Sequence, residues 1–356
     1  MRKSIFILAL SASLAAVSIA ACGGDSSSST PTSAPTAAAT AAPTATPTAV
    51  VAATDLISTK ATPANSLDAA DPAWKNARVT TVKTSVVKGS AGVAGVDVKM
   101  QALNSDTDVW FRFEYAAPAM TTAKDWVYDG AKFKAPSGQG DRLGLMWEIK
   151  PSTDFEAKGC AALCHNPETD KVAQWYMVSP TGSLMDLWQW TVGTSNGFKQ
   201  AGDYTFTDKV PEPTALGSVF VADANTGGGN VANTNDTKDA PIKMQDPAKK
   251  PSLGPQYLLV SEAVALDVTK LKAGDKIPNA ILEPFKGDRG DVDAFGTWAN
   301  GTYTIVFHRN MDTGNAATDV KFAAGGLYKF GLGVWIALGN VDHTVSTEAY
   351  TVKFAK

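Results

Sequence analysis

Hydrophobic and polar residues alternate along most of this chain, in short runs separated by glycine, asparagine, aspartate and proline. Such alternation places successive side chains on opposite faces of a strand, whereas an amphipathic helix has a longer repeat. The clearest runs cover residues 96–103, 109–115, 143–149, 188–192, 303–307 and 327–338. The pattern predicts a mainly β fold, an antiparallel β-sandwich with long loops and few short helices.

The first 65 residues depart from this pattern. Arg2 and Lys3 precede an apolar run, and small residues then lead to Cys22. These features predict a lipoprotein signal peptide over 1–21 and a lipid on Cys22; the alternative is an ordinary cleaved signal with no role for Cys22. Residues 22–65 are rich in Ser, Thr, Ala and Pro, which cannot bury enough apolar surface to offset the entropy cost of ordering. We expect them to form a disordered tether.

The remaining segment, 66–356, is long enough to form a sizeable core. We expect a long irregular insertion near 209–250, because that interval is rich first in proline and then in glycine, asparagine and aspartate. No later run reaches the length of a membrane span. The sequence therefore predicts an exported protein that faces the periplasm or the cell exterior and is anchored by lipid. A net charge of −3 does not suggest nucleic acid as a partner.

The motif with the clearest chemistry is Gly-Cys-Ala-Ala-Leu-Cys-His at 159–165. It is one residue wider than the Cys-x-x-Cys-His motif that attaches a c-type haem. In that chemistry two thiols bond to the porphyrin and the following histidine binds the iron. We therefore predict one covalent haem c on Cys160 and Cys164, with His165 as an axial ligand. The alternatives are a small disulfide between the cysteines and a different metal site that includes His165.

Met146 is the first choice for the second axial ligand. Along 142–149, residues Leu143, Leu145 and Trp147 share one face of a strand, which leaves Gly144, Met146 and Glu148 on the other. A glycine beside Met146 would give a flat macrocycle room to approach. A thioether opposite histidine is common in cytochromes c and raises the reduction potential. The alternative role of Met146 is packing in the core.

Five sequence blocks together resemble a family of haem-binding domains. They are Asp-Arg-Leu-Gly-Leu-Met-Trp at 141–147, Met-Asp-Leu-Trp-Gln-Trp at 185–190, Asp-Ala-Phe-Gly-Thr-Trp at 293–298, Thr-Ile-Val-Phe-His-Arg-Asn-Met at 304–311 and Phe-Gly-Leu-Gly-Val-Trp at 330–335. The likeness covers most of 74–356. The family is typified by the γ subunit of ethylbenzene dehydrogenase. It implies a β-sandwich that binds one haem and exchanges electrons with a partner, and its best-known members bind a b-type haem through Met and Lys.

The resemblance adds weight to Met146, which falls where the methionine ligand of the family lies. It also brings in His343, which lies roughly where the family has its lysine; His343 is our second choice, and a histidine on a surface loop is the alternative. Arg142 and Arg309 are possible contacts for haem propionates, because guanidinium groups pair well with carboxylates. The alternative for each arginine, and the more common role of such residues, is a solvated position or a structural partner.

The leading hypothesis is an extracytoplasmic, lipid-anchored monohaem cytochrome c that transfers electrons between respiratory partners. The resemblance suggests a molybdenum oxidoreductase or another cytochrome as the partner. The alternative is a β-sandwich module without haem that recognises carbohydrate or another surface ligand through some of its nine tryptophans. A third hypothesis is an enzyme that acts at an open coordination position of the haem. No motif in the sequence indicates hydrolytic or transferase chemistry.

Overall fold

A computed structural model describes residues 56–87, 94–122, 125–136, 138, 140–164, 176–209, 221–336 and 343–356 of the chain. The chain divides into two compact units, 1–50 and 51–356, and the described residues belong to the second. The predicted signal peptide, Cys22, most of the tether and His165 lie outside the described residues.

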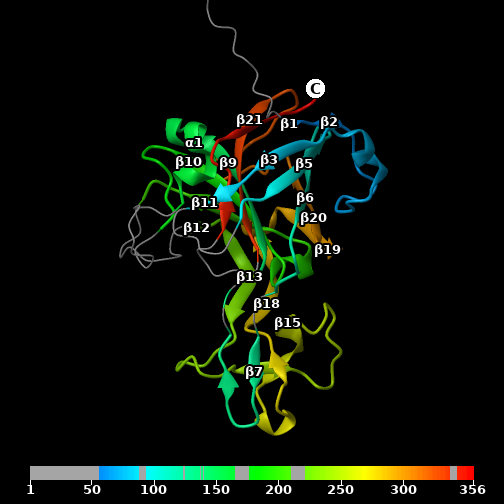
Figure 1. Ribbon diagram of the computed structural model, residues 1–356, viewed down its shortest axis with the longest axis vertical. Helices are drawn as coiled ribbons and strands as arrows, with labels where there is room; N and C mark the ends of the chain where they lie inside the picture. Colours follow the sequence, from blue (N-terminus) through cyan, green and yellow to red (C-terminus); the bar gives the residue numbers. More distant parts are fainter. Residues whose placement is uncertain are drawn as a thin grey trace, which may run out of the picture. The chain divides into compact units, whose positions relative to one another are not determined.

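Two β-sheets form the main part of the second unit (Figure 1). The first sheet contains β1 (Leu56–Ile57), β4 (Ser85–Val86), β9 (Arg142–Lys150), β10 (Leu184–Thr191), β11 (Gly202–Phe206), β12 (Val221–Ala222), β21 (Leu327–Trp335), β22 (Thr344–Val345) and β23 (Tyr350–Lys353). Its central order is β23-β21-β9-β10-β11. The second contains β2 (Thr59–Lys60), β3 (Thr80–Lys83), β5 (Asp97–Asn104), β6 (Asp108–Ala116), β19 (Asp293–Ala299) and β20 (Thr302–Asn310).

Shorter strands and helices complete the described part of the chain. The strands are β7 (Trp126–Tyr128), β8 (Phe133–Lys134), β13 (Asn225–Ala232), β14 (Lys243–Gln245), β15 (Leu258–Leu259), β16 (Ala263–Ala265), β17 (Lys276–Ile277) and β18 (Ala280–Gly287). The helices are α1 (Thr153–Lys158) and the 3-10 helices η1 (Pro72–Asn76), η2 (Gly159–Ala162), η4 (Ser195–Phe198), η5 (Val260–Glu262), η6 (Val268–Lys270) and η7 (Asp288–Gly290). None of the helices described has the length and apolar character needed to cross a bilayer.

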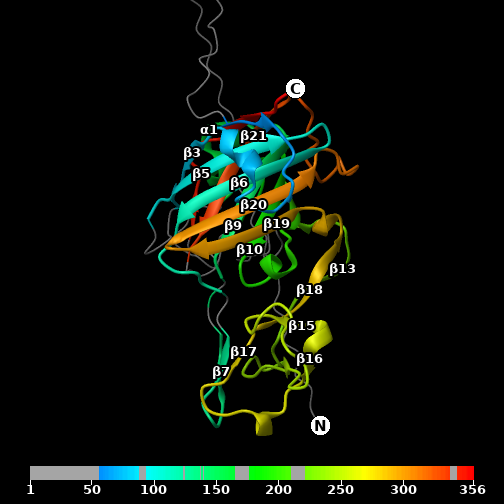
Figure 2. The same cartoon turned by 90° about the vertical axis from the view of Figure 1, so that its right-hand side faces the viewer.

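All six alternating runs of the sequence form strands, namely β5, β6, β9, β10, β20 and β21. The long strands pair in antiparallel fashion within each sheet, as in the pairs β9–β10, β9–β21, β5–β6 and β6–β20. The prediction of a mainly β, antiparallel sandwich is therefore confirmed. In Figure 2, β5, β6 and β20 lie across the strands of the first sheet.

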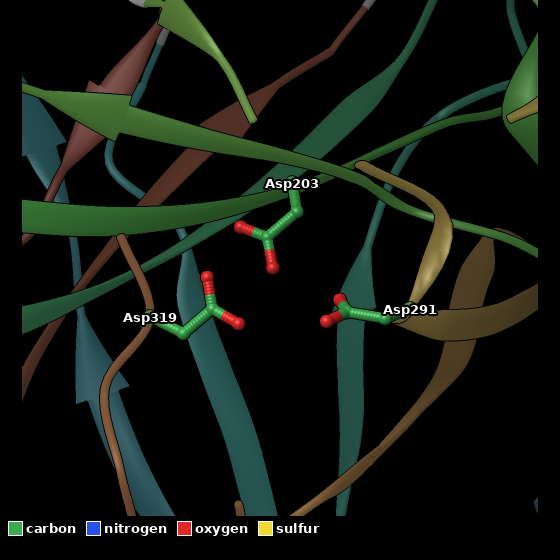
Figure 3. A group of neighbouring side chains, drawn as sticks. All are labelled: Asp203, Asp291 and Asp319. Carbon is green, nitrogen blue, oxygen red and sulfur yellow. The ribbon is translucent and has the colours of Figure 1, made fainter. Parts of the chain in front are cut away.

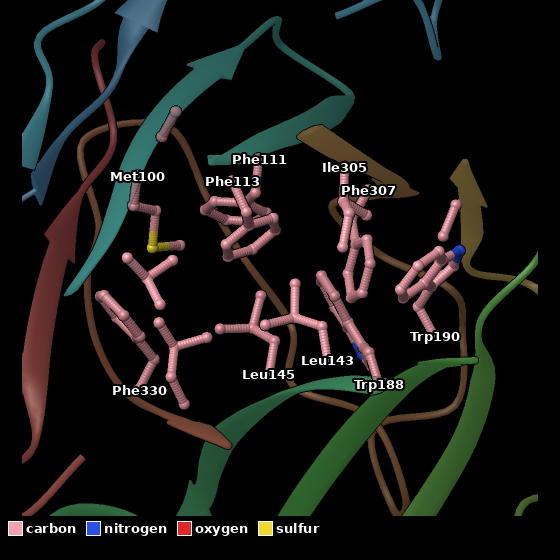
Figure 4. Close-up of a cluster of buried hydrophobic side chains, with 14 of the residues drawn as sticks. Met100, Phe111, Phe113, Leu143, Leu145, Trp188, Trp190, Ile305, Phe307 and Phe330 are labelled. Atoms are coloured by element: carbon pink, nitrogen blue, oxygen red, sulfur yellow. The ribbon is translucent and has the colours of Figure 1, made fainter. Parts of the chain in front are cut away.

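The core lies between the two sheets and is rich in aromatic side chains. Phe111 and Ile305 from the second sheet face Leu145, Trp188 and Phe330 from the first (Figure 4). All five are fully buried. Aromatic side chains of this size contribute much of the apolar area that stabilises a core.

The interval near 209–250 is less irregular than the sequence suggested, because β12, β13 and β14 lie within it. β13 pairs with β18, a partner distant in sequence, and its register shifts on both sides of Gly227. Gly228 has a φ of 78°, and a Cβ there would collide with the carbonyl oxygen of Pro284. The run of glycines that indicated a loop thus permits a bulged strand.

Candidate functional site

Met146 lies on the face of the first sheet that points away from the second sheet, here called the outer face. The alternation predicted along β9 is confirmed: Leu143, Leu145 and Trp147 belong to the sandwich core, whereas Met146 belongs to a separate buried cluster. On the neighbouring strands Met146 pairs with Leu187 and Gly331. Its side chain is only 2% exposed, so something must cover this face.

The cover is the short helical segment that carries the two cysteines. Ser152 caps α1, its hydroxyl accepting a hydrogen bond of 3.3 Å from the backbone N–H of Phe155. Gly159 has a φ of 55°, and a Cβ there would collide with the carbonyl oxygen of Glu348. The N–H of Ala161 then donates to the carbonyl oxygen of Ser346 at 3.3 Å. These contacts hold η2 against the chain that follows β22.

Cys160 is placed directly over Gly331. A Cβ at Gly331 would lie 2.6 Å from the Sγ of Cys160, so glycine is what allows the thiol to approach the sheet. Gly331 is in turn the β-sheet partner of Met146. Cys160, Cys164 and Met146 therefore meet in one buried cluster, together with Phe155, Leu163, Met185, Leu187, Phe206, Val345 and Val87. We call this group the sulfur cluster.

Both thiols of the sulfur cluster are free and buried. Burial raises the pKa of Cys164 to about 12. Burial also raises the pKa of Cys160 well above its ordinary value; the neighbouring Cys164 adds to this, and a hydrogen bond with Ser346 opposes it. The two groups are therefore neutral thiols at physiological pH, which an apolar environment accommodates without a counter-charge.

Arg142, Trp335 and His343 lie along the same face. Arg142 and Trp335 are sheet partners, and the guanidinium carbon lies 4.8 Å from the centre of the Trp335 ring. The His343 ring stacks on Trp335 at 4.6 Å with an interplanar angle of 15°. Both Arg142 and His343 are at least nine-tenths buried. His343 leads directly into β22, and Val345 of that strand packs in the sulfur cluster.

The guanidinium of Arg142 is incompletely satisfied. Within the described part of the chain its Nε and Nη2 have no hydrogen-bond partner. Burial lowers its pKa to about 10, so the group remains charged at neutral pH. A buried cation with unused donors would be stabilised by an anionic partner such as a carboxylate of a ligand.

Arg309 is the predicted site residue that the structure does not bring to the outer face. Its side chain is fully buried on the opposite, inner side of the first sheet. There Nη1 donates to Asp186 at 3.0 Å, and the guanidinium lies 4.5 Å from the centre of the Trp188 ring. Arg309 thus has a structural partner. His165, next to Cys164 in sequence, lies outside the described residues.

Glycines lie at the centre of the outer face; Gly144 was identified from the sequence, whereas Gly331 and Gly333 were missed. Gly144 and Gly333 are direct sheet partners, and Gly331 lies beside them. The space over Gly144 is occupied by Leu187 and Trp335, and the space over Gly333 by Trp335 and Val345. A flat group could lie on this backbone only if these side chains moved. The Gly-x-Gly pattern at 331–333 was the available signal.

The donors on this face, two thiols, a thioether and an imidazole, suit a haem better than a hard metal ion. A c-type haem needs two thiols close to an axial ligand, and the sulfur cluster supplies both thiols beside Met146. Arg142 adds a cation suited to a propionate. The chemistry of the residues therefore fits the group.

Residues 71–349 match the model of a protein family described as ethylbenzene dehydrogenase. No curated protein sequence matches the chain.

Among solved structures, a family 9 carbohydrate-binding module from Caldicellulosiruptor kristjanssonii bound to glucose is similar, with 8% identity and a TM-score of 0.32, covering 85% of this chain and 97% of that one. A putative carbohydrate-binding protein from Bacteroides uniformis is similar with 7% identity and a TM-score of 0.35, covering 84% and 98%. Likenesses at these scores carry no argument about the ligand.

Proposed function

Because this chain belongs to the ethylbenzene dehydrogenase family, we propose that it is a haem-binding β-sandwich protein that carries electrons. The observation that supports this most is the meeting of Met146, Cys160 and Cys164 in one buried cluster. Cys160 and Cys164 follow Met146 by 14 and 18 positions, and the turn of the chain from β9 through α1 into η2 brings all three residues into this cluster. A haem bound there would supply an iron that gains and loses one electron.

Each residue has a separate part in this proposal. Cys160 and Cys164 would hold the haem covalently, each through a thioether made by adding its S–H across a vinyl group of the porphyrin. His165 would be one ligand of the iron, and Met146 or His343 would be the second. Arg142 pairs with a propionate. Burial in the sulfur cluster then excludes water from the iron, which helps to set the reduction potential.

The proposal extends to location and partner. A lipid on Cys22 and a tether formed by the part of 22–65 that precedes β1 would hold the domain at the outside of a membrane. The partner would be a molybdenum oxidoreductase or another cytochrome that approaches an exposed haem edge. These parts rest on the sequence alone.

The first test is haem attachment to the full chain, expressed together with haem-attachment machinery. We expect covalent haem on a denaturing gel and one haem per chain by pyridine haemochrome. The double variant Cys160→Ala/Cys164→Ala should lose the covalent haem, whereas Cys22→Ser, which removes the proposed lipidation site and leaves both haem-binding thiols, should keep it. A wild-type chain that stays free of covalent haem under these conditions would overturn the proposal.

The second test identifies the axial ligand. Met146→Leu should abolish the far-red sulfur-to-iron charge-transfer band, and Met185→Leu should leave it unchanged. Met185 is the matched control, since it is fully buried in the same cluster, and replacing Met by Leu costs less than about 1.5 kcal/mol in most cores. If the band is missing and only His343→Gln makes the iron high-spin, the ligands are two histidines. A high-spin wild type that binds cyanide would favour an enzyme instead.

A haem-free carbohydrate-binding module is the second candidate function. A sugar platform needs exposed aromatic rings. In the described part of the chain Trp298 is half-buried, and the other tryptophans are buried. Calorimetry with glucose and cello-oligosaccharides tests this candidate: binding by wild type that Trp298→Ala weakens would support it.

A further inference from the structure

Five aspartates gather on the inner side of the first sheet, outside the proposed haem site. Asp186 comes from β10, Asp203 from β11 and Asp223 from the residue after β12, while Asp291 follows η7 and Asp319 lies between β20 and β21. In Figure 3 the carboxylates of Asp203, Asp291 and Asp319 point toward a common space. One carboxylate oxygen of each lies within 4.8 Å of the others.

The positive charge beside these carboxylates comes from Arg309. Its Nη1 lies 3.0 Å from Asp186 Oδ2 and 4.0 Å from Asp203 Oδ2, and all three side chains are fully buried. Hydroxyl groups provide further partners: Thr205 donates to Asp223, and Thr313 and Thr318 donate to Asp319. Among the described residues no second cation pairs with the five aspartates. The single positive charge of Arg309 does not neutralise five carboxylates.

Asp203 is the second, independent sign of a ligand. Its side chain is 0% exposed, yet neither carboxylate oxygen accepts a hydrogen bond from an N–H or hydroxyl donor among the described residues. The groups within hydrogen-bonding reach include two other carboxyls, those of Asp186 and Asp291. Oδ1 of Asp291 and Oδ2 of Asp223 are likewise buried without a hydrogen bond. A buried carboxylate in this condition costs several kcal/mol unless something neutralises it. Asp203 and Asp291, which carry buried oxygens without a hydrogen bond, are two of the three residues whose carboxylates converge.

We propose that Asp203, Asp291 and Asp319 bind a hard divalent cation, with Ca²⁺ as the preferred ion. The donors are all oxygen, which favours Ca²⁺ or Mg²⁺ over the transition metals that prefer nitrogen and sulfur. Ca²⁺ accepts irregular shells of six to eight oxygens, whereas Mg²⁺ demands a near-ideal octahedron. Carboxylates from a strand and two separate loops form an irregular set. Asp291 is only partly buried, so it provides the approach from solvent.

The site would join parts of the chain that are remote in sequence. Asp203 belongs to β11 of the first sheet, Asp291 precedes β19 of the second sheet, and Asp319 comes from the loop between β20 and β21. A cation bound by all three would connect the two sheets at this edge. Its role is structural and does not depend on haem.

Protons are the competing way to neutralise the cluster. Burial raises the pKa of Asp203 well above its ordinary value, and raises the pKa of Asp291 and of Asp223 to about 7. Protons and a cation therefore compete for the same oxygens. An experiment at pH 7.5 with and without Ca²⁺ separates the two possibilities.

The test uses the full chain after treatment with a chelator. Calorimetric titration with CaCl₂ at pH 7.5 should show one site with a Kd below about 1 mM, within the range of protein calcium sites. Mg²⁺ should bind at least tenfold more weakly. Asp203→Asn and Asp291→Asn should each weaken Ca²⁺ binding at least tenfold, whereas Asp106→Asn, an exposed carboxylate elsewhere, should leave it unchanged.

Thermal unfolding keeps the proposal testable if a variant folds poorly. Ca²⁺ should raise the Tm of the wild type and of Asp106→Asn but not of Asp203→Asn. Equal Tm values for the wild type in chelator and in millimolar Ca²⁺, with no heat of binding, would overturn the proposal and leave a cluster neutralised by protons. Binding of Mg²⁺ as tight as that of Ca²⁺ would overturn the preference for Ca²⁺. Haem content is unaffected by any of these outcomes.

Discussion

The two faces of the first sheet bury opposite kinds of chemistry on the same strands. On β10, Met185 and Leu187 point to the outer face and its sulfur cluster, whereas Asp186 and Trp188 point to the inner face. Most side chains of both groups, the sulfur cluster and the aspartates, are buried. They differ in what burial costs, because neutral sulfur needs no compensation, whereas a carboxylate must gain a proton, a cation or hydrogen bonds.

The comparison shows how a strand with a period of two residues can separate soft donors from hard ones. The sulfur cluster on the outer face is stabilised by packing, so substitutions within it should act through volume and contact. The inner face is stabilised by charge compensation, so removal of one charged group should change the electrostatic energy of all the neighbouring charged groups.

The largest loss of stability is expected from the substitution Arg309→Met. The change leaves Asp186 and Asp203 without their cation in a fully buried site, and breaking a buried ion pair costs about 3–5 kcal/mol. Chemical denaturation in the presence of a chelator measures the loss. The exposed Arg78 provides the matched control, and Arg78→Met should change the free energy of unfolding by less than about 0.5 kcal/mol. A loss below about 1 kcal/mol for Arg309→Met would mean that the carboxylates are already protonated.

The second effect concerns thiol reactivity in protein made without haem attachment. Because the pKa of Cys164 is about 12 and that of Cys160 is also raised, little thiolate exists at pH 8. Alkylation of both residues by iodoacetamide should be at least about a hundredfold slower in the native protein than in the unfolded protein. Mass spectrometry of peptides reads each site separately. Rapid native alkylation would show that η2 does not stay on the sheet.

The third effect is expected from Gly331→Ala. The added Cβ would lie 2.6 Å from Cys160 Sγ and 3.0 Å from the backbone nitrogen of Cys160, so η2 must move away. Overpacking of this kind costs about 1–3 kcal/mol. Gly144→Ala is the comparison, because its nearest contact is the tip of Leu187 at 3.2 Å and that side chain can adjust. Equal losses for the two variants in urea denaturation would contradict the assigned close approach of Cys160.

The smallest effect is a dependence of stability on pH at His308, which belongs to neither cluster. Burial alone would lower the pKa of His308, but Asp293 and Asp108 outweigh it and raise the pKa above 6.5. Nδ1 lies 3.1 Å from Asp293, Nε2 lies 3.0 Å from Asp108, and the ring stacks on Trp110.

A histidine whose folded pKa is raised stabilises the fold below its unfolded pKa, and that contribution disappears as pH rises through the folded pKa. As pH rises from 6 into the range above 6.5, the free energy of unfolding of the wild type should therefore fall by about 1 kcal/mol or less relative to that of His308→Gln. Parallel pH profiles for the two proteins would show that folding leaves the pKa of His308 unchanged, contrary to the prediction.

The sequence was informative wherever the signal was local. Alternation along 143–149 correctly divided Leu145 and Trp147 from Met146, because side chains on a strand alternate whatever the strand packs against. It could not identify Arg309 as the partner of Asp186, since two residues 123 positions apart meet only when the sheets stack. The strand β13 was missed for a similar reason, because its partner β18 lies far along the chain and its glycines resemble a loop.

The sequence by itself determined the β-sandwich, its main strands, the family and the chemical types of the candidate ligands. These follow from a period of two, turn residues and short motifs, all of which are properties of neighbouring residues. The tertiary structure alone decided that Cys160 lies over Gly331 beside Met146, that Arg142 and His343 share Trp335, and that Asp203, Asp291 and Asp319 converge. Those meetings depend on strand order and on the packing of distant segments, which the order of residues along the chain does not express.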